Sequence, residues 1–91
     1  MPSFSVSIPE NLAEGLRSRG VDIDSYVVEL IIRELRLDPR SEAEAHLELS
    51  RRFLREASDL LNRDSVQASE KLHKAAEEAV KALAVAMSLQ D

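Results

Sequence analysis

One short segment near the N-terminus has the alternating pattern of a β-strand, and it constrains the fold because a strand cannot stand alone. Residues 3–8 place serine at every odd position and the apolar Phe4, Val6 and Ile8 at every even one. The backbone N–H and C=O groups of a strand need hydrogen-bond partners, and no second segment shows this pattern. We therefore predict that the segment pairs with the same segment of another copy, so that the chain is at least a homodimer.

The chain beyond residue 9 has the start and stop signals of helices and their hydrophobic periodicity. Pro9 and Gly20 suit the start and the end of a first short helix over about residues 9–19. Asp22 or Asp24 can cap a second helix, which is the most hydrophobic and whose broad apolar face predicts a place at the centre of a dimer. The predicted dimer interface comprises Phe4, Val6, Ile8, Tyr26, Val27, Leu30 and Ile31.

The second half of the chain predicts a helical hairpin. Asp38 and Pro39 open a third helix that runs to about residue 62, and residues 64–67 have the spacing of a capping box before a fourth, alanine-rich helix. We expect one face of the fourth helix to contact the Leu54 and Leu61 side of the third helix, and the remaining alanines to leave a second face for another helix. The predicted helical-face interface consists of Leu72, Ala76, Ala79 and Leu83.

The predicted fold is therefore mainly α. It comprises a short N-terminal β-strand paired between subunits, two short helices, and a long antiparallel helical hairpin. Residues 1–37 form the dimerisation segment, and residues 38–91 form the hairpin.

Composition narrows the functional classes. The net charge of −5 lowers the expectation of nucleic-acid binding through phosphate neutralisation. The sequence has no cysteine, which is compatible with a reducing cytosol, and no apolar run long enough to cross a bilayer. We expect a cytoplasmic protein without a membrane association.

No group of residues predicts catalysis convincingly, so we expect no enzyme activity, no cofactor and no metal. Arg40 and His46 match the loose spacing of some helical ribonucleases, but two solvated side chains explain the pair better. His73 lacks a second ligand at a metal-binding spacing and is expected at the surface or a helix interface. The cluster of Arg51, Arg52 and Arg55 has acidic residues four positions away, which predicts a salt-bridged, solvated face.

A polar stripe on the N-terminal segment offers a different use for a paired ribbon. Two such strands would present their hydroxyls on one face, a shape that fits the major groove of DNA. Serines have short reach and no charge, so the solvent face of a dimerising ribbon is the competing explanation. The possible DNA-facing residues are Ser3, Ser5 and Ser7.

The N-terminal part of the chain resembles a ribbon-helix-helix domain, through residues 4–10, Gly20 and residues 23–35. The resemblance implies an intertwined dimer that binds operators through its paired strands, as in antitoxins and repressors, with the three serines facing the bases. The chain departs from this family because those positions lack basic or amide side chains.

Nearly the whole chain is also similar to the archaeal PaREP family, whose helical core is placed in the HEPN superfamily. Residues 20–26, residues 37–39 and above all the run QASEKLHKAAEEAVKALA at residues 67–84 carry this similarity. Family members usually continue with further helices, so the resemblance implies a short or truncated member. The arginine-histidine motif of HEPN ribonucleases is not found near the later helices, and the resemblance therefore implies fold and association rather than activity.

Two functions follow from these patterns. The first is a non-enzymatic, homo-oligomeric interaction or scaffold protein of the PaREP type, or an antitoxin-like protein, with a toxin or a nucleotidyltransferase as possible partner. The alternative is a ribbon-helix-helix transcriptional regulator whose helical hairpin oligomerises; DNA binding is thus possible but not favoured.

Overall fold

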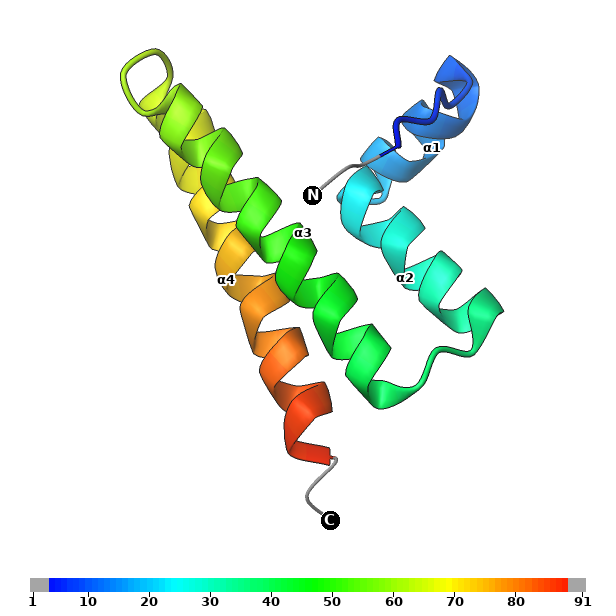
Figure 1. Ribbon diagram of the computed structural model, residues 1–91. Helices are drawn as coiled ribbons and strands as arrows, with labels where there is room; N and C mark the ends of the chain where they lie inside the picture. Colours follow the sequence, from blue (N-terminus) through cyan, green and yellow to red (C-terminus); the bar gives the residue numbers. More distant parts are fainter. Residues whose placement is uncertain (1–3, 89–91) are drawn as a thin grey trace. The chain divides into compact units, whose positions relative to one another are not determined.

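The computed structural model describes residues 4–88, and over this range it contains four α-helices (Figure 1). They are α1 (Glu10–Ser18), α2 (Ile23–Leu35), α3 (Pro39–Leu60) and α4 (Ser65–Ser88). The described residues fall into two compact units that divide between Ile31 and Ile32. None of the helices within residues 4–88 is both long enough and apolar enough to cross a membrane. The prediction of a mainly helical chain ending in a helical hairpin is confirmed.

The predicted N-terminal β-strand is wrong. Residues 4–9 have no regular secondary structure, and residues 4–88 contain no strand. Phe4 and Val6 are 97% and 80% exposed, and of the three alternating apolar side chains only Ile8 is half-buried. Alternation favours an extended backbone, but the hydrogen bonds of a ladder must come from a second strand, and the described chain supplies none. The strand pairing between subunits is not supported, and Ser3 lies outside the described residues.

The first two helices end in the same hydrogen-bonded motif. After α1, the N–H of Gly20 donates to the carbonyl of Arg17 and the N–H of Val21 donates to that of Leu16. Gly20 has a φ of +70°, the left-handed conformation that this Schellman motif requires and that glycine adopts without strain. The predicted end of the first helix is therefore confirmed.

At the end of α2 the left-handed position is occupied by an arginine. Arg36 has a φ of 51°, its N–H donates to the carbonyl of Arg33, and the N–H of Leu37 donates to that of Ile32. The hydrogen bonds are those of a second Schellman motif, but a side chain at this φ is strained.

Aspartate side chains cap the starts of three helices, as their positions in the sequence predict. The N–H of Ser25 donates to Asp22 at 3.0 Å, that of Ser41 to Asp38 at 2.8 Å, and that of Gln67 to Asp64 at 3.0 Å. The last of these lies in the turn between α3 and α4, where the chain reverses direction within a few residues (Figure 1). The caps thus set where the two long helices begin.

Small residues allow α3 and α4 to pack closely along their length. The core of this hairpin contains two large apolar side chains, Leu49 and the fully buried Phe53, both on α3. The buried positions of α4 are three alanines and Glu78, so little apolar bulk separates the helix axes. The buried residues are His46, Leu49, Ser50, Phe53 and Ala57 on α3, and Ala68, Ala75, Glu78 and Ala82 on α4.

Candidate functional site

A buried polar cluster lies in the core of the hairpin. His46 of α3 and Glu78 of α4 are 2% and 1% exposed, and His46 Nδ1 lies 2.8 Å from Glu78 Oε1. A carboxylate can only accept, so Nδ1 of the imidazole carries the proton of this bond. Lys81 Nζ donates to Glu78 Oε2 at 2.9 Å. Both carboxylate oxygens therefore have donors, which offsets the cost of burying the charge.

Three further contacts tie α3 to α4. The Ser50 hydroxyl donates to the backbone carbonyl of Ala75 at 2.7 Å, and both residues are buried. Lys71 Nζ lies 2.9 Å from Glu56 Oε1 and 5.3 Å from the centre of the Phe53 ring. The ion pair and the cation–π contact hold one lysine across the helix interface. These contacts fix which residues of the two helices lie level with each other.

The burial of His46 corrects the expectation that it is a solvated side chain. Arg40 is exposed at the start of α3, whereas His46 is enclosed by the hairpin, so the two do not form a common exposed site. His73 is at the surface, as expected, with Nε2 2.8 Å from Glu77 Oε1. Within residues 4–88 no three His, Cys, Asp or Glu side chains are grouped to hold a metal.

The arginine cluster of α3 has acidic neighbours along its own helix. Arg51 lies 3.9 Å from Glu48, and Arg52 lies 3.8 Å from Glu56. The second pair has the predicted spacing of four, and the first has a spacing of three. Arg51 is exposed, whereas Arg52 is half-buried with its guanidinium 6.0 Å from the centre of the Phe53 ring.

One long face of the hairpin is apolar and exposed. The core of the hairpin is not built from the predicted helical-face interface of Leu72, Ala76, Ala79 and Leu83 with the Leu54 and Leu61 side of α3, but from the neighbouring positions. Instead, these residues of α4 lie at the surface. Leu47 and Leu54 of α3 and Leu61, which caps its end, recur every seven residues on the matching side and are also exposed. We call this surface the hairpin face.

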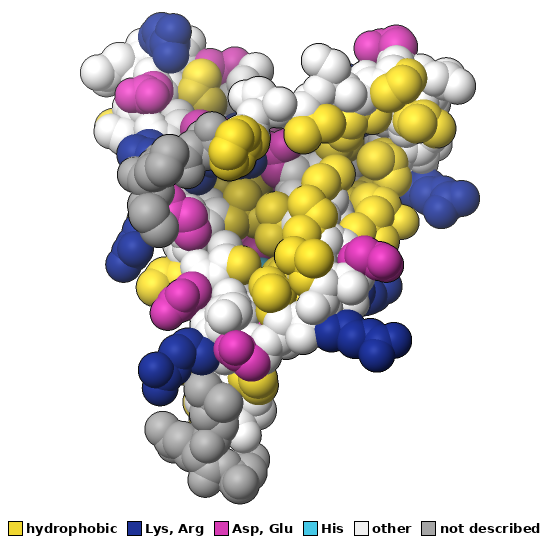
Figure 2. Space-filling view, turned by 45° about the vertical axis from the view of Figure 1, so that its right-hand side comes forward, with side chains coloured by type: hydrophobic (Ala, Val, Ile, Leu, Met, Phe, Trp, Pro, Cys, Tyr) yellow, Lys and Arg dark blue, Asp and Glu magenta, His cyan; other side chains and the backbone are white. Residues whose placement is uncertain are grey.

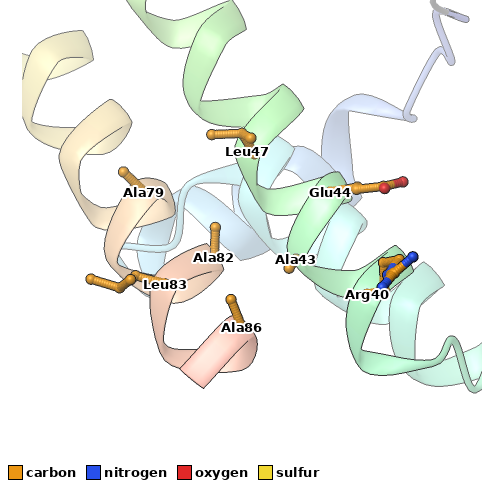
Figure 3. A pocket seen from close by; sticks show the side chains of 8 residues that line it. All are labelled: Arg40, Ala43, Glu44, Leu47, Ala79, Ala82, Leu83 and Ala86. Atoms are coloured by element: carbon orange, nitrogen blue, oxygen red, sulfur yellow. The ribbon is translucent and has the colours of Figure 1, made fainter. Parts of the chain in front are cut away.

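A groove runs between the two helices at one end of the hairpin face. Figure 3 shows Leu47 pointing toward α4 and the Glu44 carboxylate pointing away from it. The groove floor is therefore apolar, and its charged side chains stand at the edge. Its lining residues are Arg40, Ala43, Glu44 and Leu47 of α3 with Ala79, Ala82, Leu83 and Ala86 of α4.

The N-terminal unit also has an exposed apolar surface. Figure 2 shows hydrophobic side chains gathered at the surface over α1 and α2. Ile8, Tyr26, Val27 and Leu30 of the predicted dimer interface come together in one groove with α1 residues such as Leu12. The structure does not place Phe4, Val6 or Ile31 in this groove, although all three are exposed.

The serines of the N-terminal segment have no strand to align them. Ser5 and Ser7 are exposed on an irregular backbone, so they do not form the regular row of hydroxyls that a ribbon would present. With Ser3 outside the described residues, the three positions make up no described site.

The buried His46–Glu78 pair is the feature that sequence reasoning missed. The signal was available in the spacing, because positions 46, 50, 53 and 57 of α3 and positions 68, 75, 78 and 82 of α4 are three, four or seven apart. The expected seam followed the leucines instead, since leucine usually occupies a core position and histidine and glutamate usually do not.

Residues 4–88 form an all-α structure. It contains a helical hairpin with a buried polar pair in its core, and it has two exposed apolar surfaces. The model of the archaeal PaREP1/PaREP8 family matches residues 45–91, which is just over half of the sequence. The chain belongs to this family, and the resemblance to the PaREP family is confirmed over these residues. The matched residues include His46, Glu78 and most of the hairpin face. Searches of the curated proteins and of the solved structures each gave no significant match.

Proposed function

We propose that this chain acts by association rather than by catalysis, as a homo-oligomeric scaffold or antitoxin-like protein of the PaREP type located in the cytoplasm. One observation carries the proposal. In the N-terminal unit, Ala13 is buried whereas large apolar residues remain exposed, among them Phe4, Val6, Leu12, Leu30 and Ile31. A unit of about thirty residues cannot bury enough surface to be stable alone. A second copy of the same unit would cover these side chains.

The burial of His46 supports the non-enzymatic part of the proposal. A histidine that acts as general acid or base must reach its substrate, directly or through one water. His46 is enclosed, and its Nδ1–H is engaged by Glu78. We therefore assign this pair a role in holding the hairpin together, and we expect no RNA cleavage by the purified chain.

The alternative of an operator-binding regulator has lost its main support. That function requires paired strands that carry base-facing side chains into the major groove. Residues 4–9 are irregular, and Ser5 and Ser7 offer no charge for phosphate or base contacts. A gel-shift assay at low salt with mixed genomic fragments tests this alternative directly, and we expect no retarded band.

Substitutions in the N-terminal unit test self-association. In the variant Leu30→Asp/Ile31→Asp, two exposed apolar side chains become charged, and burial against a second copy becomes unfavourable. We expect light scattering after gel filtration to show a smaller assembly than for the unchanged chain. The control is Glu34→Ala, an exposed change on the same helix. Equal masses for all three proteins would refute this surface as the interface.

A heterologous partner, such as a toxin or a nucleotidyltransferase, would be encoded by a neighbouring gene if the protein is antitoxin-like. Co-expression of this chain with the neighbouring product, followed by purification through a tag on one of them, tests this. We expect a stable complex, whereas recovery of only the tagged protein would leave the scaffold role.

A further inference from the structure

The hairpin face is apolar along its whole length and lacks a covering element within the hairpin. Seven large apolar side chains on or beside it are 40 to 65% exposed: Leu47, Leu54, Leu61, Leu72, Val80, Leu83 and Met87. At about 100 Å² each they amount to about 700 Å², close to the roughly 800 Å² that each partner contributes to a stable interface. A face of this size needs an apolar partner of similar length.

The charges along the edge of this face identify the partner. Six exposed or half-exposed charged residues follow the outer side of α3 at spacings of four, four, three, four and four, so they form one row. In chain order they are Arg40, Glu44, Glu48, Arg51, Arg55 and Asp59. Their signs are plus, minus, minus, plus, plus, minus.

The charges of this row are complementary to the charges of the same row read in the opposite direction. When a second α3 runs antiparallel beside the first, Arg40 faces Asp59, Glu44 faces Arg55, and Glu48 faces Arg51. Every pair then joins opposite charges, and each pair occurs twice because of the two-fold symmetry. A parallel arrangement would place like charges together, which is unfavourable.

Helix α4 is compatible with the same two-fold axis. The hydrogen bond from Ser50 to the carbonyl of Ala75 shows that the middle of α3 lies level with Ala75. The axis would therefore pass close to Ala76, an exposed residue of the hairpin face. A small side chain at this point lets two copies of α4 approach closely.

From these observations we propose that the hairpin face binds the hairpin face of a second copy, with α3 against α3 and α4 against α4, both antiparallel. The result is a four-helix bundle with an apolar centre and charged edges. This surface is separate from that of the N-terminal unit, and the inference extends the proposed self-association. Two self-complementary surfaces on one chain would build a closed tetramer or a longer assembly.

A charge exchange tests the arrangement in the full chain. Glu44→Arg places an arginine opposite Arg55, and Arg55→Glu places a glutamate opposite Glu44, whereas the variant carrying both changes restores opposite charges. We expect each single variant to weaken the hairpin association about tenfold, and the double variant to recover most of it. Both changes are made in chains carrying Leu30→Asp/Ile31→Asp, so that sedimentation equilibrium reports the hairpin interface alone.

Ala76→Glu provides a second test, because it places two carboxylates against each other at the axis. The matched control is Ala84→Glu, an exposed alanine on the side of the same helix that faces away from the buried Ala75 and α3. In the same Leu30→Asp/Ile31→Asp background, we expect the first change to give monomers and the second to leave the mass unchanged. Equal behaviour of both, or single charge variants that associate like the double variant, would overturn the proposal. The far-ultraviolet circular dichroism of every variant checks that the helices remain folded.

The charge variants are made in chains carrying Leu30→Asp/Ile31→Asp. A failure of this inference can therefore be told apart from a failure of the proposed function. If the N-terminal substitutions leave the assembly unchanged but the charge exchange shows recovery, the hairpin interface stands and the N-terminal interface fails. If the N-terminal substitutions alone give monomers, the hairpin interface is refuted.

Discussion

His46 Nδ1 donates to Glu78 Oε1 at 2.8 Å across two helices whose other core residues are mostly small or apolar. The pair lies 32 positions apart in the sequence, so only one register of α3 against α4 brings the two residues together. Lys81 satisfies the second carboxylate oxygen. A buried polar pair of this kind favours one alignment of two helices over the alternatives, because sliding either helix would leave a buried charge without its donor.

Removal of one partner of this pair should destabilise the hairpin strongly. We expect His46→Ala to lower the free energy of unfolding by about 3 kcal/mol, because the buried Glu78 carboxylate loses a donor. Urea unfolding followed by circular dichroism measures this. Glu77→Ala, at an exposed neighbouring position, should change stability by less than about 0.5 kcal/mol.

The double variant His46→Ala/Glu78→Ala completes a thermodynamic cycle. Since the two side chains are in contact, the costs of the single changes should not add, and the coupling should be about 1–3 kcal/mol. Additive costs would show that the two side chains do not stabilise each other.

Close helix packing predicts a contrast between two alanines of α4. Ala75 is buried against α3, so Ala75→Leu should cost about 1–3 kcal/mol through overpacking. Ala84 is exposed, and Ala84→Leu should be nearly neutral. Thermal unfolding of both variants, each checked for helix content, measures the difference. A tolerated leucine at position 75 would mean that the helices are farther apart than described.

The left-handed arginine at the end of α2 predicts a stabilising substitution. Arg36→Gly removes the strain of a side chain at a φ of 51° and keeps the hydrogen bonds of the Schellman motif. We expect a gain of about 0.5–1 kcal/mol, after allowing for the greater freedom of glycine in the unfolded chain. Arg33→Gly, within the same helix, should instead destabilise it by about 1 kcal/mol. Thermal unfolding of the two variants shows whether their effects have opposite signs.

Asp38 gives the start of α3 a pH dependence. The N–H of Ser41 donates to its carboxylate, which lowers the pKa of Asp38 below the ordinary 3.8. The charged form is favoured in the folded chain, so its contribution to stability is present above the ordinary pKa and is lost as the pH falls through the lower folded value. An NMR titration of the carboxyl carbon should show the lowered pKa. Asp38→Asn keeps a capping side chain but should remove this contribution to the pH dependence.

Local signals in the sequence predicted much of the helical structure. Helix caps act through contacts with their immediate neighbours in the sequence, so they can be predicted without knowledge of the tertiary structure. This holds for the aspartates at positions 22, 38 and 64 and for the glycine at position 20. The expected strand failed because its stability depends on a partner that the described chain does not contain. The position of the hairpin core was predicted wrongly because leucine indicates a buried position only where a chain has enough polar residues to cover its surface. Here Leu49, Phe53, small residues and a polar pair form the core, and the other leucines of the predicted seam, Leu47, Leu54 and Leu61, are exposed.

The most direct test of the account is the mass of the unchanged chain in solution, measured by sedimentation equilibrium over a wide range of concentration. Association through exposed apolar surfaces predicts a mass of at least twice the 10.2 kDa of one chain, with dissociation on dilution. A single species of 10.2 kDa at every concentration, with native helix content, would contradict the account.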